Sequence, residues 1–274
     1  MKLENKTFVV TGGGSGLGRQ LVLQLVRSGC RVAALDINAD ALEETVRMAG
    51  GSNRVLPLVA NITDREAVKA LPEQVVKRFG YIDGLINNAG IIQPFIHVEE
   101  MDDALIDRIF SINFFGTLNM VRAFLPFLRQ SDEACLVNVS SLGGFVPVSG
   151  QTMYGASKAA VKQLTDGLRA ELDGTPIHVM TVIPGAMATP IRQNSGLEAV
   201  NIEKQKTKEA LSPEIAAKSI VDAIRADKLE LYVGKDSRLM HQLFRFIPLK
   251  ATKWLNDNIR KQHAEMEAKG TGRK

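Results

Sequence analysis

Short apolar runs alternate along the chain with segments in which apolar residues recur every three or four positions. The runs lie at about 7–11, 31–36, 55–60, 85–86, 135–139, 177–182 and 230–234, and most are continuous rather than alternating. Continuous apolar strands separated by amphipathic helices are typical of a parallel sheet covered on both faces. The pattern therefore predicts an α/β fold with a doubly wound parallel sheet of about seven strands and helices on both faces.

Proline and capping residues add local detail to this prediction. Pro57 is awkward in a central strand, so the third strand is expected near an edge of the sheet. Asp64 has the position of a helix cap, and Pro213 that of a first helical residue. The helices are predicted at about 17–26, 39–48, 65–79, 99–130, 152–173 and 213–226.

Composition narrows the class of protein. Of 274 residues, 45% are hydrophobic and 23% charged, as in soluble globular proteins. The net charge of +4 is modest and its excess lies near the C-terminus, which argues against nucleic acid as a partner. Cys30 and Cys135 lack C-x-x-C spacing and are expected to be buried, reduced thiols. With neither a leader nor a membrane span in the sequence, a cytoplasmic location is expected.

The first strand leads directly into a glycine-rich turn. Thr11, Gly12, Gly16 and Gly18 fit the spacing T-G-x-x-x-G-x-G, whereas the commoner G-x-G-x-x-G would need a glycine at Leu17. Main-chain N–H groups at a helix N-terminus can bind a pyrophosphate, and glycines allow its close approach. A plain tight turn would need only one or two glycines.

An acidic residue ends the next apolar run. Asp36 lies 20 residues after Gly16, where an acid can accept hydrogen bonds from an adenosine ribose. Turn and acid together favour a dinucleotide site over a purely structural turn.

Candidate acid/base chemistry lies further along. Tyr154 and Lys158 are four residues apart, on one face of a predicted helix. The ordinary tyrosine pKa of about 10 is too high for proton transfer near neutrality, and a nearby ammonium favours the phenolate. Taken alone, such a pair is more often a half-buried tyrosine and a solvated lysine on an amphipathic helix. Ser141, which follows a strand, could hold a substrate oxygen, with Ser140 as the competing hydroxyl.

Asn113 is a poor residue for a helix interior. Its carbonyl could bind a water molecule that links Lys158 to solvent, which would explain an asparagine at this position.

Together these residues resemble the motifs of the short-chain dehydrogenase/reductase superfamily, with Asn87-Asn88-Ala89-Gly90 and Pro184-Gly185 completing the set. The resemblance covers about residues 5–234 and implies a Rossmann-type sheet, a nicotinamide cofactor and a catalytic tetrad of Asn113, Ser141, Tyr154 and Lys158. In that tetrad Tyr154 would be the general acid/base and Lys158 would lower its pKa and bind the nicotinamide ribose. Ser141 would orient the substrate and Asn113 support a proton relay.

The same resemblance implies a set of cofactor-binding residues and no metal ligands. The set comprises Gly12, Gly14, Ser15, Gly16, Leu17, Gly18, Asp36, Asn61, Ile62, Asn88, Ala89, Gly90, Tyr154, Lys158, Pro184, Gly185, Met187 and Thr189. Many members have an aspartate where Asn61 stands.

Asp36 also bears on cofactor choice, because its carboxylate would repel a 2′-phosphate and accept from a free 2′-hydroxyl. Ser15 and Ile37 supply no cation at the positions where NADP-selective relatives usually have one, and Arg19 is the only nearby charge. NAD is therefore favoured over NADP.

The residues predict an oxidoreductase that transfers a hydride between a nicotinamide cofactor and a secondary alcohol or carbonyl compound. The alternative is a non-catalytic NAD-binding regulatory or scaffold protein on the same fold, against which the complete tetrad argues. A small alcohol or ketone is the expected partner, and a homo-oligomer, either dimer or tetramer, is expected by analogy.

The chain is expected to consist of a Rossmann-type domain at 1–234 and a C-terminal extension at 235–274. Residues 235–262 interleave apolar with basic side chains, and Pro248 is expected to split them into two helices. The segment either packs on the protein or a neighbouring subunit, covers the active-site entrance, or lies on an anionic membrane. A membrane location would suit a lipophilic substrate of steroid-, retinoid- or acyl-like character. Residues 189–211 are expected to close over substrate, and 264–274 to be disordered.

Overall fold

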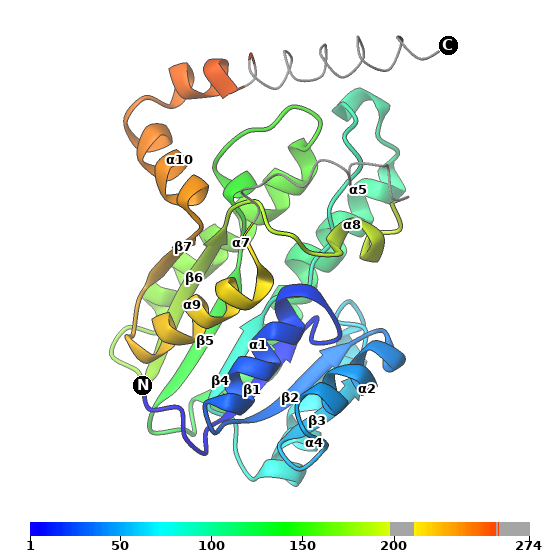
Figure 1. Cartoon of the computed structure of the whole chain (residues 1–274), viewed down its shortest axis with the longest axis vertical. Coiled ribbons are helices and arrows are strands. Elements are labelled where there is room, and N and C mark those ends of the chain that lie inside the picture. Colours follow the sequence, from blue (N-terminus) through cyan, green and yellow to red (C-terminus); the bar gives the residue numbers. More distant parts are fainter. Residues whose placement is uncertain (198–210, 256, 258–274) are drawn as a thin grey trace.

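The computed structural model describes residues 1–197, 211–255 and 257, and its centre is a parallel sheet of seven strands in the order β3-β2-β1-β4-β5-β6-β7 (Figure 1). The order reverses direction between β1 and β4, as in doubly wound folds, so that ligands are expected above that point. The strands are β1 Thr7–Thr11, β2 Arg31–Asp36, β3 Val55–Val59, β4 Gly84–Asn87, β5 Ala134–Val139, β6 Ile177–Pro184 and β7 Glu230–Val233.

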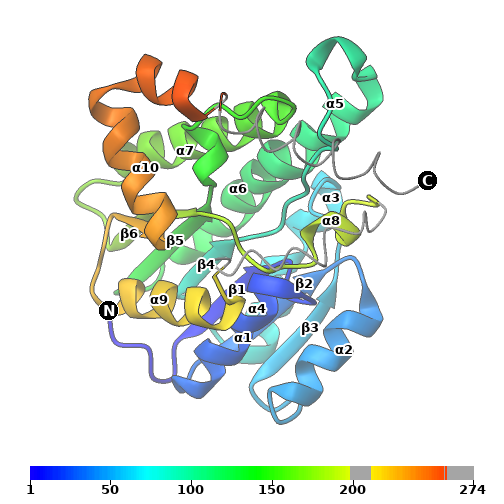
Figure 2. The same cartoon turned by 45° about the horizontal axis from the view of Figure 1, so that its top comes forward.

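Helices cover both faces of this sheet, as predicted. On one face α1, α2 and α9 pack against alternate strand residues such as Phe8 and Val10, and on the other α3, α4, α6 and α7 pack against residues such as Val9 (Figure 2). The helices are α1 Gly16–Arg27, α2 Ala39–Met48, α3 Arg65–Lys69, α4 Leu71–Phe79, α5 Asp103–Phe110, α6 Thr117–Leu128, α7 Thr152–Glu171, α8 Ile191–Asn194, α9 Pro213–Arg225 and α10 Lys235–Phe246.

Several local predictions are confirmed. β3, which contains Pro57, is an edge strand of the sheet. The Asp64 carboxylate caps α3 by accepting from two main-chain N–H groups, and Pro213 is the first residue of α9. Cys30 and Cys135 are free and buried.

The single helix predicted over 65–79 is wrong in its continuity. The structure has two helices, α3 and α4, with the break at Ala70 and Pro72 in the first turn of the second. Proline lacks an N–H and its ring clashes with the carbonyl four residues earlier, so the first helix has to end before it.

The predicted helix over 99–130 is also interrupted. A short 3₁₀ turn at Val98–Glu100 is followed by α5, by a π-helical turn at Ser111–Gly116 and then by α6. At the end of the π turn a Cβ on Gly116 would lie 2.6 Å from the Ile62 side chain, so glycine permits the close packing there. Such wide turns occur often at functional sites.

The C-terminal region follows β7 directly. α10 ends at Phe246 and a second helical stretch covers 248–255, so the split expected at Pro248 is confirmed. The expected substrate-closing segment and the expected disordered tail fall partly or wholly on 198–210 and 258–274, outside the described residues. Among the described helices, none has the length and apolar character that crossing a membrane requires.

Candidate active site

One cavity of about 740 Å³ lies at the carboxyl ends of the strands, where the site was predicted. Of the predicted site residues, Gly14, Gly18 and Asn113 do not line it and support it from behind. All the others do: Gly12, Ser15, Gly16, Leu17, Asp36, Asn61, Ile62, Asn88, Ala89, Gly90, Ser141, Tyr154, Lys158, Pro184, Gly185, Met187 and Thr189.

The glycine turn has the shape of a phosphate-binding loop. Gly12 and Gly16 have φ values of 68° and 50°, in the left-handed region that favours glycine. A Cβ on Gly18 would lie 1.9 Å from the main-chain oxygen of Gly12, so the start of α1 can pack here only with glycine. Gly14 lies behind the turn, where a Cβ would lie 2.9 Å from a carboxylate oxygen of Asp36.

The Asp36 carboxylate is fixed by the main chain. It accepts hydrogen bonds from the N–H groups of Gly14, at 2.9 Å, and Asn38, at 3.1 Å, while lining the cavity. A carboxylate oxygen has more than one lone pair, so these bonds leave acceptor capacity for a ligand hydroxyl.

Arg19 does not face a ligand at Asp36. Its guanidinium donates to the Gly14 carbonyl and the Thr45 hydroxyl, and forms a 2.6 Å ion pair with Glu44. Arg19, the nearby charge that the sequence singled out, is therefore bound to the protein itself.

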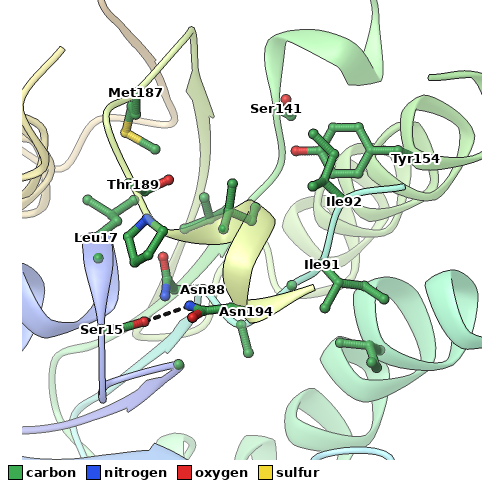
Figure 3. Close-up of a pocket in the computed structure, with 18 of the residues that line it drawn as sticks. Ser15, Leu17, Asn88, Ile91, Ile92, Ser141, Tyr154, Met187, Thr189 and Asn194 are labelled. Carbon is green, nitrogen blue, oxygen red and sulfur yellow. Dashed lines mark hydrogen bonds between the residues drawn. The ribbon is translucent and has the colours of Figure 1, made fainter. Parts of the chain in front are cut away.

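The predicted acid/base residues meet on the opposite side of the cavity (Figure 3). The Tyr154 hydroxyl points into the cavity near Ser141, and Met187 and Thr189 lie across from them. Lys158, one turn after Tyr154 in α7, is buried and donates from Nζ to the Val139 carbonyl at 3.1 Å.

Burial changes the proton affinity of both groups. It raises the pKa of the Tyr154 phenol above its usual value, and a hydrogen bond with Ser141 acts in the opposite direction. It lowers the pKa of the Lys158 ammonium to about 8 because little in the interior replaces water around the charge. Without a ligand the phenol is therefore protonated at neutral pH.

Ser140 and Ser141 take different roles in the structure. The Ser140 hydroxyl is buried and donates to the Lys158 carbonyl at 2.8 Å, so it holds α7. The Ser141 hydroxyl faces the cavity and accepts from the Gly143 N–H at 3.1 Å. Both serines line the cavity, but the Ser140 hydroxyl donates within the protein; that Ser141 holds a substrate oxygen stays a prediction.

Asn113 is fully buried in the π-helical turn. Its side-chain oxygen accepts from the Ile91 N–H at 2.8 Å, and its amide donates to the Ile91 carbonyl and the Ser157 hydroxyl, both at 3.0 Å. Its own carbonyl accepts from the Thr117 hydroxyl at 2.9 Å. These contacts join α7 to the loop after β4 and give a structural reason for an asparagine here; its part in a proton relay stays a prediction.

Thr11 joins the glycine turn to the segment after β4. Its hydroxyl accepts from the N–H groups of Asn88, at 2.9 Å, and Ala89, at 3.0 Å, while the Asn88 amide donates to the Thr11 carbonyl. A Cβ on Gly90 would lie 3.1 Å from the Lys158 amine, so the glycine there makes room for the lysine.

Gln93 is a residue that sequence reasoning missed. It is fully buried, its side-chain oxygen accepts from the Tyr154 N–H at 2.7 Å, and its amide donates to the Gly150 carbonyl at 2.9 Å. The first N–H groups of a helix have no partner within it, so Gln93 caps α7 from another segment. A lone polar residue in the apolar stretch 91–96 was the available signal.

Two further supports come from the C-terminal half. The Asn194 amide of α8 donates to the Ser15 hydroxyl at 2.8 Å (Figure 3). Asp236, in the first turn of α10, accepts from the Ala186 N–H at 2.8 Å, and a Cβ on Gly185 would lie 2.2 Å from its carboxylate. The turn after β6 is thus fixed by the C-terminal region.

Comparison with known proteins agrees with this geometry. The family model described as short chain dehydrogenase matches residues 6–199. A putative oxidoreductase, SadH, of Mycobacterium tuberculosis is 35% identical over 255 residues, which cover 89% of this chain and 91% of that protein. The chain therefore belongs to the short-chain dehydrogenase family of oxidoreductases.

Solved structures agree in fold. The 3-ketoacyl-(acyl-carrier-protein) reductase from Brucella melitensis, complexed with NADH, has a TM-score of 0.76 at 26% identity, covering 84% of this chain and 97% of its own. A short chain dehydrogenase from Burkholderia cenocepacia, in complex with NADP, has a TM-score of 0.78 at 28% identity, covering 93% and 99%.

Replacing Gln93 with alanine leaves the Tyr154 N–H without its partner, removes one of the two side-chain hydrogen bonds to the Gly150 carbonyl and leaves a cavity. We expect the free energy of unfolding to fall by about 3 kcal/mol, measured by urea denaturation. Gln74→Ala, on the exposed side of α4, is the control and should change it by less than about 0.5 kcal/mol. Equal effects at the two positions would contradict the capping role.

Lys158→Met should stabilise the cofactor-free protein, because it removes a buried ammonium, by about 2 kcal/mol near pH 7. The folded-state pKa of about 8 lies below the unfolded value of 10.5, so the cost of burial is complete below pH 8 and is lost as pH rises towards 10.5. The advantage of the variant should therefore shrink between pH 7 and pH 9.5 in urea titrations. An advantage that grows with pH would refute this account.

Proposed function

We propose that the protein catalyses reversible hydride transfer between a nicotinamide cofactor, with NAD preferred, and a secondary alcohol or its carbonyl counterpart. The observation that carries this proposal is the meeting of Ser141, Tyr154 and buried Lys158 in the same cavity as the glycine turn and Asp36. The family supports the reaction class, since its members are oxidoreductases.

The cavity has the groups that a dinucleotide needs. Its pyrophosphate would be held by main-chain N–H groups of the turn at 12–18, where glycines leave the approach open, and its adenosine ribose by Asp36. The turn after β6, with Met187 and Thr189, would adjoin the nicotinamide. When bound, the cofactor supplies or accepts the hydride.

Tyr154 would move the proton that accompanies this hydride. In reduction the protonated phenol, which burial favours, donates to the carbonyl oxygen of the substrate, and in oxidation the phenolate takes the alcohol proton. The Ser141 hydroxyl donates a hydrogen bond to the same substrate oxygen and so holds it beside the phenol. The charge of Lys158 favours the phenolate and is kept in place by the Val139 carbonyl.

A non-catalytic cofactor-binding protein is the alternative that the sequence left open. Such a protein would gain nothing from a buried lysine ammonium, whose desolvation destabilises the fold, or from a buried phenol pointing into the cavity. The arrangement therefore favours an enzyme.

The fixed Asp36 carboxylate supports NAD over NADP. A 2′-phosphate would lie against a negative charge, and neither Ser15 nor Ile37 offers a cation, while Arg19 is bound to Glu44. Relatives of similar fold were solved with NADH and with NADP, so the preference rests on these residues of this chain.

The substrate side of the cavity suits a lipophilic compound of steroid-, retinoid- or acyl-like character. Apolar side chains line the cavity, with Ile92 beside Tyr154 (Figure 3), and a substrate with extended hydrocarbon surface would be stabilised by contact with them. These side chains are Ile91, Ile92, Phe95, Leu142, Val148 and Ile191. Assembly as a homo-oligomer and a cytoplasmic location stay predictions.

Tyr154→Phe should lower turnover of a responsive secondary alcohol by about 10²–10⁴-fold, since it removes the proton-transferring hydroxyl and keeps the ring. NAD affinity should stay within about threefold of the wild type. A screen of secondary alcohols with NAD, followed by the absorbance of the reduced nicotinamide, identifies the substrate and then measures the variant. Tyr81→Phe, on the exposed surface, is the control and should keep activity. Full activity in Tyr154→Phe would refute the assignment.

Asp36→Asn should reduce the preference for NAD over NADP by about tenfold, because it removes the charge that repels a 2′-phosphate and keeps an acceptor oxygen. Isothermal titration calorimetry with both cofactors measures the ratio of the two Kd values. Asp40→Asn on the exposed start of α2 is the matched control and should leave the ratio unchanged. An unchanged ratio in Asp36→Asn would contradict the cofactor assignment.

A further inference from the structure

The segment 235–255, formed by α10 and the helical stretch after it, has two faces of different character. On its inner face Phe244 and Ala251 are buried against Val146 in the loop after β5. The inner face therefore packs on the protein, which is one of the alternatives expected from the sequence. This packing leaves the outer face without a partner among the described residues.

The outer face presents apolar side chains to solvent. Residues 245–250 are six consecutive exposed positions, in which apolar side chains and a proline lie between Arg245 and Lys250. Phe246 is 77% exposed, Leu249 86% and Trp254 53%. Large apolar side chains grouped in this way mark a surface that binds something apolar.

Charge indicates what that partner is. The segment 235–255 carries five basic side chains and one acidic side chain, and that acid, Asp236, already accepts a hydrogen bond from Ala186. By contrast, residues 1–234 carry 24 basic and 26 acidic side chains. Exposed apolar side chains among basic ones are the combination that favours an anionic lipid surface.

We propose that the outer face of residues 235–255 docks on an anionic lipid membrane, with Phe246, Leu249 and Trp254 entering the interface and Arg245, Lys250 and Lys253 facing lipid headgroups. The docking does not depend on the proposed reaction. Aromatic and aliphatic tips insert at the boundary of the acyl chains while basic side chains remain among the phosphates.

A second apolar surface lies at the same end of the molecule. The loop before α5 exposes Phe95 and Val98, and in Figures 1 and 2 this part of the chain and α10 both lie at the top. Acidic residues crowd this loop at 99–103, and an anionic surface would repel them. The contact is therefore confined to the C-terminal segment.

The docking surface is backed by a wall of the cavity. Leu142 and Val148 line the cavity on one side and pack against the cluster that contains Phe244 and Ala251 on the other. Given the proposed function, a lipophilic substrate dissolved in the membrane would thus lie close to the cavity of the docked enzyme.

The chain has one tryptophan, Trp254, which reports directly on this surface. Full-length protein is mixed at low salt with vesicles of phosphatidylcholine alone or with 30% phosphatidylglycerol added, and is followed by tryptophan emission and flotation. Docking predicts a blue shift and flotation with the anionic vesicles and loss of both at high salt, since exposed charges are screened there. Absence of flotation at low salt overturns the proposal.

Two variants separate the contributions. The double variant Phe246→Asp/Leu249→Asp should lower partitioning onto the anionic vesicles by at least about tenfold. The double variant Lys250→Glu/Lys253→Glu should lower it by at least about fivefold for each lysine replaced. Ile215→Asp, which changes a 57% exposed residue on α9, should bind like the wild type. Circular dichroism and NAD binding verify that each variant is folded.

Sedimentation without lipid tests the other occupant, a second copy of the chain. If the wild type self-associates through this face, its emission shifts to the blue as protein concentration rises, and Phe246→Asp/Leu249→Asp abolishes the shift. That result, with no flotation, would overturn the membrane assignment. The proposed reaction would stand or fall separately, by the turnover of Tyr154→Phe.

Discussion

Hydrogen bonds from three other segments hold one turn of α7, and the candidate site depends on that turn. Gln93 binds the Tyr154 N–H, Asn113 binds Ser157, and Ser140 binds the Lys158 carbonyl. The three contacts come from the loop after β4, from the π-helical turn and from the end of β5. The Tyr154 N–H lies in the first turn of α7 and has no partner within the helix, so losing Gln93 would leave it unpaired. Together the three contacts favour one position for the turn.

The same turn contains a cost to stability. Lys158 is buried as an ammonium, with its pKa lowered, and one hydrogen bond to Val139 replaces only part of its hydration. The surrounding apolar core, in which strand residues such as Phe8 and Leu85 are fully buried, stabilises the fold enough to tolerate it. Strained or desolvated groups persist in this way where function needs them.

Most of the sheet and most of the cavity lining could be predicted from sequence, because continuous apolar runs, glycine spacing and Asp36 each reflect a local requirement. The division of the helix at 65–79 was also a local effect, of Pro72, which the apolar period concealed. Gln93 and Asp236 act across long sequence separations, on Tyr154 and Ala186, and no periodicity encodes such contacts. The roles within the tetrad came from family resemblance, and only the placement of its members is a property of the structure.

The position of Pro57 has a consequence for the outer boundary of the sheet. The Ala60 N–H donates to the Asp36 carbonyl in β2. Main-chain N–H groups of successive strand residues point alternately toward the two neighbouring strands, so the nitrogen of Pro57, three residues earlier, points away from β2 and out of the sheet. A proline nitrogen carries no hydrogen, and the free margin of β3 lacks a donor at its midpoint. This margin is therefore a poor template for an incoming strand, which protects the folded protein from growing into intermolecular β-structure.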